Sequence, residues 1–309
     1  MELFKDSHFD FLGRKWWFIL PSLILILAGL ANILVRGPLY SIDFKSGVVM
    51  DVQWDGEPPV ERIRAAVSSR LKGVTVMAAH DMTGSNEVLV SAELPAGGDV
   101  TNLQQTIREA LSSITPGYSV RDFEAIGPQI GEDLRHQAFM ATAGASGGML
   151  AYLSYRFRLA YGVAAVVAML HDALITIGLL SLLHQEISLT VVAALLTLVG
   201  YSMNDTIVVF DRVRENRHIY GRDSLSEIIN RSINQTLSRT VLTSGLTLLT
   251  AVALLLFGGQ VLRGFSLALV FGIVVGTFSS IFVASPILLL CEQGQTRWST
   301  SNALAGGVR

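Results

Sequence analysis

Near the middle of its length the chain reads Gly200-Tyr201-Ser202-Met203-Asn204-Asp205-Thr206-Ile207-Val208-Val209-Phe210-Asp211-Arg212-Val213-Arg214-Glu215-Asn216. The first half of this segment ends an apolar stretch, residues 187–210, that is long enough to cross a bilayer as a helix. Asp205 lies well inside the stretch, and the arginines begin only after it ends. A carboxylate is costly at membrane depth, so it faces a bundle interior or a water path and marks a candidate functional site.

The composition is that of a membrane protein. Half of the 309 residues are hydrophobic and 16% are charged, whereas charged residues make up about 25% of a typical soluble domain. The formal net charge of −2 gives no reason to expect a nucleic-acid partner. Cys291 is the single cysteine, so no internal disulfide can form.

Six apolar segments are predicted to span the membrane, with a polar region between the first and the second. The first is expected to remain as a helix, because no small-residue cleavage site follows it. The segments are residues 16–35, 137–155, 159–183, 187–210, 236–257 and 265–290. The expected units are residues 1–36 (N-terminus and first helix), 37–135 (soluble domain with its connectors), 136–292 (five further helices) and 293–309 (tail).

Basic residues predict the orientation of these segments. Lys5, Arg14 and Lys15 precede the first segment, and Arg156 and Arg158 fill the turn between the second and third. The loop at residues 184–186 has no Lys or Arg. Short basic loops stay in the cytoplasm, so both termini are expected inside and the soluble domain outside. The connection between the fourth and fifth segments agrees, with Arg212, Arg214, Arg217, Arg222 and Arg231.

The polar region predicts a small α+β domain. Residues with strand-like alternation and residues with helical periodicity follow one another in the order βαββαβ. This order is typical of the ferredoxin-like fold, which has many functions and therefore assigns none. The predicted strands are residues 48–54, 74–79, 87–93 and 118–125, the helices are 59–71 and 100–114, and a hairpin turn lies at 83–86.

An amphipathic cytoplasmic helix is predicted at residues 223–235. Asp223 or Ser224 is the expected N-cap, because both side chains accept hydrogen bonds from a first helical turn. Its apolar face is expected to pack on the membrane surface or on a neighbouring helix end, with a specific partner-binding role as the alternative. That face consists of Leu225, Ile228, Ile229 and Ile233.

Asp205 has two interpretations, a proton carrier or one half of a fixed salt bridge. Arg239 on the next segment is the candidate cation. Asp205 precedes Asp211 by six residues and Arg239 follows Arg231 by eight, so both are expected about 10 Å from the cytoplasmic side, at matched depth. Arg239 is equally consistent with a side chain that extends to the lipid head groups.

Other polar residues at membrane depth are candidates for a hydrated path, although hydroxyls also bond to their own helix. His171 and Asp172 form a second ionisable pair, for which a proton relay and an interhelical hydrogen-bond clamp are both open. The remaining candidates are Asn204, Thr206, Asn234, Thr236, Ser238, Thr240, Thr243 and Ser244.

Two glycine patterns, Gly144-xxx-Gly148 and Gly272-xxx-Gly276, predict close helix packing. Zinc-ligand spacings, phosphate-binding loops and nucleophile–base pairs are absent from the sequence. We therefore expect no metal, no cofactor and no enzymatic reaction. Any work must be driven by an ion gradient or by a partner.

Five blocks of the sequence carry a resemblance to a known family: Tyr40–Gly47, Leu170–Thr176, Gly200–Asn216, Asn234–Thr240 with Thr243-Ser244, and Leu262–Phe265 through Val274–Thr277 to Ser285-Pro286. By these blocks the chain resembles the SecF family, the smaller membrane subunits of the bacterial SecD–SecF protein-export complex. The family usually has Asp-Phe-Thr-Gly-Gly after its first helix, where this chain has Asp43-Phe44-Lys45-Ser46-Gly47. The resemblance covers nearly the whole chain.

The resemblance implies one half of an RND-superfamily transporter in the bacterial cytoplasmic membrane. SecF-like proteins pair with SecD, whose six helices mirror theirs about a pseudo-twofold axis, and associate with the SecYEG channel and YajC. They use the proton gradient to promote late export of unfolded polypeptide. The positions matching Asp205 and Arg239 are those assigned to proton coupling in the family.

These expectations give a mechanistic hypothesis. Protonation of Asp205 weakens its attraction to Arg239 and shifts the fourth and fifth helices, and the first helix and the Tyr40–Gly47 connector pass the shift to the outer domain. Two other readings stay open: half of a small-molecule RND exporter, and a non-conducting scaffold of the translocon. The exporters have much larger outer domains, and the scaffold would make Asp205 a structural residue.

Overall fold

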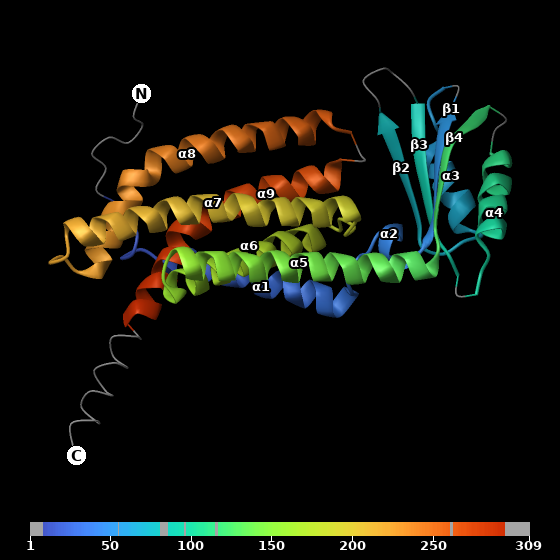
Figure 1. Cartoon of the computed structure of the whole chain (residues 1–309). Helices are drawn as coiled ribbons and strands as arrows, with labels where there is room; N and C mark the ends of the chain where they lie inside the picture. Colours follow the sequence, from blue (N-terminus) through green and yellow to red (C-terminus); the bar gives the residue numbers. More distant parts are fainter. Residues whose placement is uncertain are drawn as a thin grey trace, which may run out of the picture.

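The computed structural model describes residues 9–54, 56–80, 86–95, 97–114, 117–259 and 262–293. It consists of a long helical bundle with a small domain at one end (Figure 1). Lys5, residues 83–85 of the predicted hairpin turn and residues 294–309 of the predicted tail lie outside the described residues.

Six long helices form the bundle. A π-helical turn, η1 (Ser280–Ala284), follows the last of them just before Pro286, and residues 285–293 continue as α-helix. Pro286 lacks an N–H group, which accounts for the irregular turn ahead of it. The six are α1 (Trp16–Arg36), α5 (Pro128–Arg156), α6 (Leu159–Leu182), α7 (Leu189–Ile219), α8 (Leu225–Phe257) and α9 (Arg263–Ser279).

Within the described chain, five helical segments are long and apolar enough to cross a membrane: α1, α6, α7, α8 and Arg263–Gln293. The prediction of spanning segments is confirmed for these five. The predicted second span, residues 137–155, does form a helix as part of α5, but it is not among the five. Its glycine and alanine content makes it less apolar than the others.

Close contacts at glycine residues hold the bundle together. A Cβ atom on Gly272 would lie 2.0 Å from Leu198 Cδ1, and one on Gly276 would lie 3.0 Å from Ser202 Cβ, so α9 packs tightly on α7 as its glycines predict. The Gly144-xxx-Gly148 pattern behaves differently, because neither glycine has an atom within 4 Å of such a Cβ. The described chain therefore leaves this face of α5 without a close neighbour.

Helix α1 packs on α6 through a second glycine contact, which the sequence patterns did not predict. A Cβ atom on Gly29 would lie 2.4 Å from the Gly178 Cα atom. Three residues later, Asn32 donates from Nδ2 to Ser181 Oγ at 2.8 Å and to the Ser181 carbonyl at 3.0 Å. The first helix is thus fixed to the side of α6.

The predicted amphipathic helix and the predicted fifth span are one continuous helix, α8. Ser224 is its N-cap: Ser224 Oγ accepts from the Glu227 N–H, and the Glu227 carboxylate accepts from the Ser224 N–H at 2.9 Å. This reciprocal capping box fixes the start of the helix. No proline follows within the helix, and Ile228, Ile229 and Ile233 are buried.

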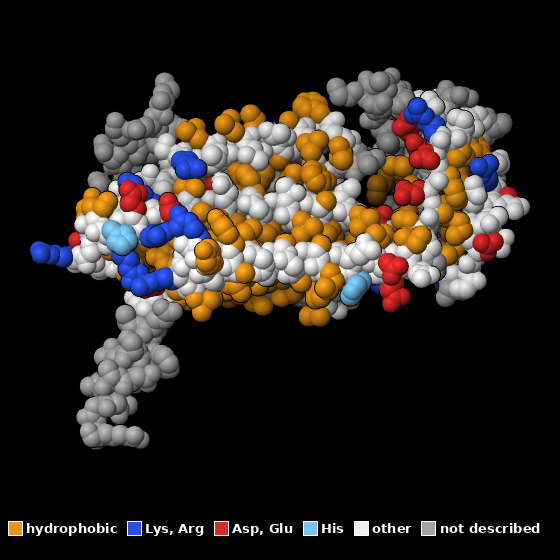
Figure 2. Space-filling model, in the orientation of Figure 1, with side chains coloured by type: hydrophobic (Ala, Val, Ile, Leu, Met, Phe, Trp, Pro, Cys, Tyr) orange, Lys and Arg blue, Asp and Glu red, His pale blue; other side chains and the backbone are white. Residues whose placement is uncertain are grey.

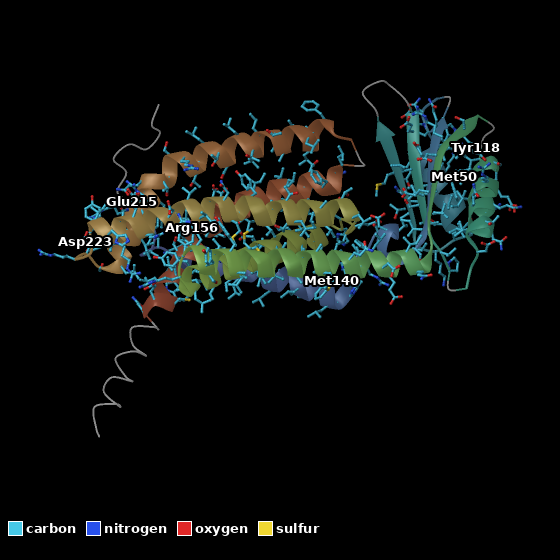
Figure 3. All side chains as sticks on the ribbon, in the orientation of Figure 1. Met50, Tyr118, Met140, Arg156, Glu215 and Asp223 are labelled. Atoms are coloured by element: carbon cyan, nitrogen blue, oxygen red, sulfur yellow. The ribbon has the colours of Figure 1, made fainter. Side chains whose placement is uncertain are left out.

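The outer domain contains two helices and a four-stranded antiparallel sheet whose order is β2-β3-β1-β4. Its elements follow one another along the chain as predicted. Alternate residues of β1 from Val48 to Trp54, among them Met50 (Figure 3), are buried against the helices. The elements are β1 (Gly47–Trp54), α3 (Val60–Ser68), β2 (Val74–His80), β3 (Asn86–Glu93), α4 (Val100–Ser112) and β4 (Tyr118–Ile126).

One carboxyl group of this sheet lacks, within the described part of the chain, a hydrogen-bond partner for one of its oxygen atoms. Asp51, in the middle of β1, has a buried Oδ1 atom without a hydrogen-bond partner among the described residues. Burial raises the pKa of the Asp51 carboxyl, Arg121 acts in the opposite direction, and Asp122 adds to the rise. The ionised form of Asp51 therefore costs the outer domain stability.

Candidate functional site

Asp205 lies in the interface between α7 and α8. Its side chain is only 2% exposed, and Ser244 of α8 donates from Oγ to Asp205 Oδ2 at 2.8 Å. Thr206 beside it is also buried, but its hydroxyl donates to the Ser202 carbonyl of its own helix at 3.2 Å. The carboxylate thus faces the bundle interior, where a second helix supplies one direct hydrogen bond.

Arg239 is on the same helix as Ser244, but it does not contact Asp205. It is exposed, and no ion pair joins it to Asp205 in the structure as described. Its charge acts on Asp205 only at longer range. Five residues separate Arg239 from Ser244, so the two side chains leave α8 about 140° apart around its axis and about 7 Å apart along it.

The other predicted lining residues differ in their surroundings. Thr240 is buried, and its Oγ1 atom has no hydrogen-bond partner among the described residues. Thr243 bonds back to its own helix, donating to the carbonyl of Arg239 at 3.0 Å and to that of Thr240 at 3.1 Å. Asn204, next to Asp205, is exposed on the outside of this chain, as Arg239 is. Of the predicted lining, Ser244 alone has a hydrogen bond with Asp205 in the described structure.

Asp172 of α6 forms a separate buried network. It contacts α7 at Ser202, about one helical turn before Asp205. It is 5% exposed, and its Oδ2 accepts from Ser202 Oγ at 2.6 Å and from Ser279 Oγ at 2.7 Å. His171 Nδ1 lies 2.9 Å from the other oxygen, Oδ1. These contacts join α6, α7 and α9, an arrangement that suits an interhelical clamp. Ser202 and Ser279 were not singled out in the sequence.

Asn234 was predicted to line a water path, but it anchors the start of the chain. Its Oδ1 accepts from the Phe9 N–H at 3.0 Å, and its Nδ2 donates to the Phe9 carbonyl at 2.9 Å. Asn230, one turn earlier, accepts from the N–H groups of Phe11 and Leu12, both at 3.1 Å. The segment before α1 is therefore held on α8.

The connector between α1 and the outer domain is bonded directly to the start of α7. It contains the short helix α2 (Ile42–Lys45), and Asp43 Oδ2 accepts from the Leu189 N–H at 2.8 Å. Leu39 and Ser41 pair with Ile187 through backbone hydrogen bonds of 2.7 and 3.0 Å. The helix that bears Asp205 thus has its N-terminus attached to the outer domain's connector.

A second contact extends this attachment to the sheet. Thr75 of β2 donates from Oγ1 to Glu186 Oε1 at 2.9 Å, in the loop between α6 and α7. The outer domain and the start of α7 therefore meet at two places, the connector and the edge strand of the sheet.

Comparison with known proteins identifies the family of this chain. A family model for the C-terminal part of the protein export membrane proteins SecD and SecF matches residues 106–294. The protein translocase subunit SecF of Koribacter versatilis is 41% identical, and the alignment covers 99% of this chain and 97% of that protein. The chain belongs to the SecF family. The SecF subunit of Rhodothermus marinus is also 41% identical, over 94% of this chain and 95% of that protein.

A crystal structure of SecDF from Thermus thermophilus agrees with this SecF assignment. It superposes with a TM-score of 0.82 at 38% identity, covering 95% of this chain and 40% of that one. A super-membrane-facing form of SecDF gives a TM-score of 0.72, also at 38% identity, over 96% of this chain and 40% of that chain. This SecF-family chain is a multi-pass membrane protein of protein translocation, and it corresponds to less than half of SecDF.

Proposed function

We propose that this SecF-family chain pairs with SecD and uses the proton motive force to promote protein export, with Asp205 as the proton carrier and Arg239 as its coupled cation. The observation that carries the proposal is a buried carboxylate on a helix whose N-terminus is bonded to the outer domain's connector. A movement of α7 caused by protonation of Asp205 can therefore be transmitted to the domain outside the membrane.

The α7–α8 interface suggests how protonation changes the structure. Ionised Asp205 has one hydrogen-bond donor and no cation in contact, a costly state for a buried charge. Arg239 and Ser244 point about 140° apart, so they cannot both face Asp205. A rotation of α8 by about 140° with a shift of about 7 Å along its axis would place Arg239 beside Asp205 instead of Ser244. Protonation of Asp205 would favour the return to the contact with Ser244.

The attachment of α7 to the connector would transmit this movement to the outer domain. A shift of α7 acts on α2 through Asp43 and on the sheet through Glu186 and Thr75. This is a shorter path than transmission through α1, which packs mainly on α6. We therefore assign the connection between α7 and the outer domain as the principal route.

The wider architecture fits a transporter half. The sheet order β2-β3-β1-β4 supports a ferredoxin-like outer domain. We propose α5 as the sixth span, because its 29 residues run alongside the other long helices (Figure 1). Basic side chains gather at the end of the bundle away from the sheet (Figure 2), which supports cytoplasmic termini and an outer domain on the opposite side.

The exposed face of the bundle supports a SecD partner. Asn204 and Arg239 are exposed within spanning helices, and Gly144 and Gly148 have no close neighbour here. A second helical half would cover such groups, and the SecDF relatives carry additional chain beyond the part matched here. SecYEG, YajC and unfolded exported polypeptide follow from the family resemblance as further proposed partners.

The proton step is tested by proton flux in liposomes that contain this chain together with SecD and an entrapped pH-sensitive dye. We expect Asp205→Asn to abolish gradient-driven proton entry, while Asp211→Asn, a carboxylate change beyond the apolar stretch, leaves it intact. Equal flux in Asp205→Asn and wild type would make Asp205 structural and favour the scaffold role.

A further inference from the structure

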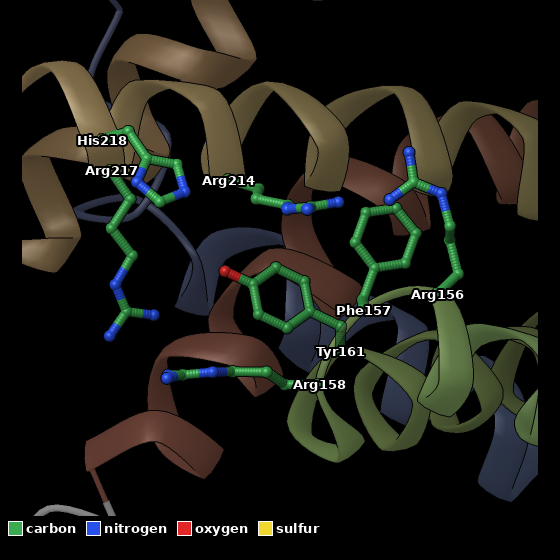
Figure 4. Close-up of a pocket in the computed structure, with 7 residues that line it drawn as sticks. All are labelled: Arg156, Phe157, Arg158, Tyr161, Arg214, Arg217 and His218. Atoms are coloured by element: carbon green, nitrogen blue, oxygen red, sulfur yellow. The ribbon is translucent and has the colours of Figure 1, made fainter.

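A cavity of 460 Å³ lies at the end of the bundle away from the sheet. The turn between α5 and α6 forms one side, and the last turns of α7 form the other (Figure 4). Nothing in the proposed proton path uses this site. Its walls include Arg156, Arg158, Arg214 and Arg217 together with Phe157 and Tyr161.

The cavity carries more positive than negative charge. Glu292 lies 3.0 Å from Arg217 and 3.8 Å from Arg158, and Asp211 lies 3.9 Å from Arg156. Four guanidinium groups thus face two carboxylates. Arg158 is 68% exposed at its side chain, and Arg214 is exposed with its guanidinium carbon 6.0 Å from the centre of the Phe157 ring.

This arrangement suits a phosphate group. A planar guanidinium donates two parallel hydrogen bonds to a phosphate, and several arginines around one cavity hold it from different sides. Arg158 and Arg214 come from opposite walls (Figure 4). His218 on the same wall as Arg214 adds a ring that carries positive charge when it is protonated.

An exposed apolar stripe runs along α6 from the level of the cavity into the membrane span, on the face of the helix opposite Tyr161. Leu159, the residue after Arg158, is 60% exposed, and Tyr155, just before Arg156, is 92% exposed. Aromatic residues of this kind mark the level of the head groups. The stripe has helical spacing along a spanning segment and consists of Leu159, Val163, Val167, Leu170 and Leu174, all exposed.

We propose that this cavity binds the phosphate head group of an anionic phospholipid. The cavity lies at the ends of two spanning helices, α6 and α7, and this position at the membrane boundary favours a lipid head group over a free phosphate ion. Basic pockets between membrane helices are sites of this chemical type. The site also lies where α7 leaves the membrane, so an occupied cavity would brace the helix that carries Asp205.

Titration of the full chain with tetraoleoyl cardiolipin or dioleoyl phosphatidylglycerol, followed by native mass spectrometry, tests the proposal. We compare wild type with the double variant Arg158→Gln/Arg214→Gln and with Arg222→Gln, which removes an exposed charge outside the cavity. We expect the double variant to bind about 30-fold more weakly, since each arginine contributes about 1 kcal/mol, and Arg222→Gln to bind as wild type does. Excess inorganic phosphate serves as competitor.

Each remaining outcome contradicts the proposal. Unchanged lipid affinity in the double variant would leave the cavity to an acidic polypeptide, and equal weakening by Arg222→Gln would indicate non-specific charge attraction. Displacement of the lipid by inorganic phosphate at matched phosphate concentration would reassign the site to free phosphate.

Arg214→Lys covers the case in which the double variant does not fold. It keeps the charge but loses the bidentate geometry, so its lipid affinity should be intermediate if the site is as proposed.

Discussion

Asp43 offers a direct test of the path from α7 to the outer domain. Its carboxylate accepts a hydrogen bond from the Leu189 N–H across 146 positions of sequence, at the first residue of α7. Ser188 caps the same helix separately by accepting from the Val191 N–H. Asp43→Ala therefore removes the side-chain link between the connector and α7. It leaves the backbone bonds of Leu39 and Ser41 to Ile187 and the helix's own cap in place.

The expected size of this effect follows from the contact. Loss of a side-chain acceptor at a helix N-terminus costs about 0.5–2 kcal/mol, which corresponds to a roughly 2- to 30-fold change in a local opening equilibrium. Hydrogen exchange of the Leu189 amide should accelerate by that factor, because this amide loses its acceptor. Exchange at Val191 should change little, since Ser188 still accepts its N–H.

Hydrogen exchange and export together check this reasoning. We expect Asp43→Ala to slow gradient-dependent export of a preprotein into membrane vesicles while proton entry in liposomes continues. Asp43→Asn keeps an oxygen acceptor, so its export rate should lie between those of wild type and Asp43→Ala. Glu124→Ala, on the exposed side of β4, is the matched control. Faster exchange at Leu189 with wild-type export would refute the assigned route.

Three further predictions follow from the packing and the charges. Gly29→Ala forces α1 away from α6 and lowers stability by about 1–3 kcal/mol, seen as a lower unfolding temperature in detergent, whereas Gly144→Ala, with open space around it, does not. The contribution of Asp51 to the stability of the outer domain is greatest below the ordinary carboxyl pKa and is lost as pH rises through its raised pKa, because the folded state then holds a partly buried charge. Asp51→Asn should abolish this part of the pH dependence in hydrogen exchange of β1. Ser244→Ala removes a hydrogen bond to ionised Asp205 worth about 1.5–3 kcal/mol and should slow gradient-dependent export; unchanged export would exclude Ser244 from the cycle.

The sequence predicted the burial of Asp205 but not its partner. Depth was counted from Asp211 and Arg231, whereas α7 continues to Ile219 and α8 begins at Leu225. Counted from these ends, Asp205 and Arg239 still lie at equal depth, because Asp205 is 14 residues before Ile219 and Arg239 is 14 residues after Leu225. A residue count does not specify how α8 is tilted against α7 or rotated about its own axis, and Ser244 is therefore beside Asp205 where Arg239 was expected.

The outer domain's element order was predictable because alternation and helical periodicity are local properties. The Asp172 network was not, because Ser202 and Ser279 come from helices far apart in sequence and their pairing depends on the packing of α9 on α7. The link from Asp43 to Leu189 has the same origin. Such long-range contacts follow from the fold as a whole, and no local pattern specifies them.

The central claim is that a proton bound at Asp205 drives export. Its most direct test is preprotein export in membrane vesicles with and without a proton gradient, comparing wild type with Asp205→Asn at equal protein level and equal assembly with SecD. The account predicts that Asp205→Asn loses the gradient-dependent part and keeps the ATP-driven part. Gradient-dependent export at the wild-type level in Asp205→Asn would contradict it.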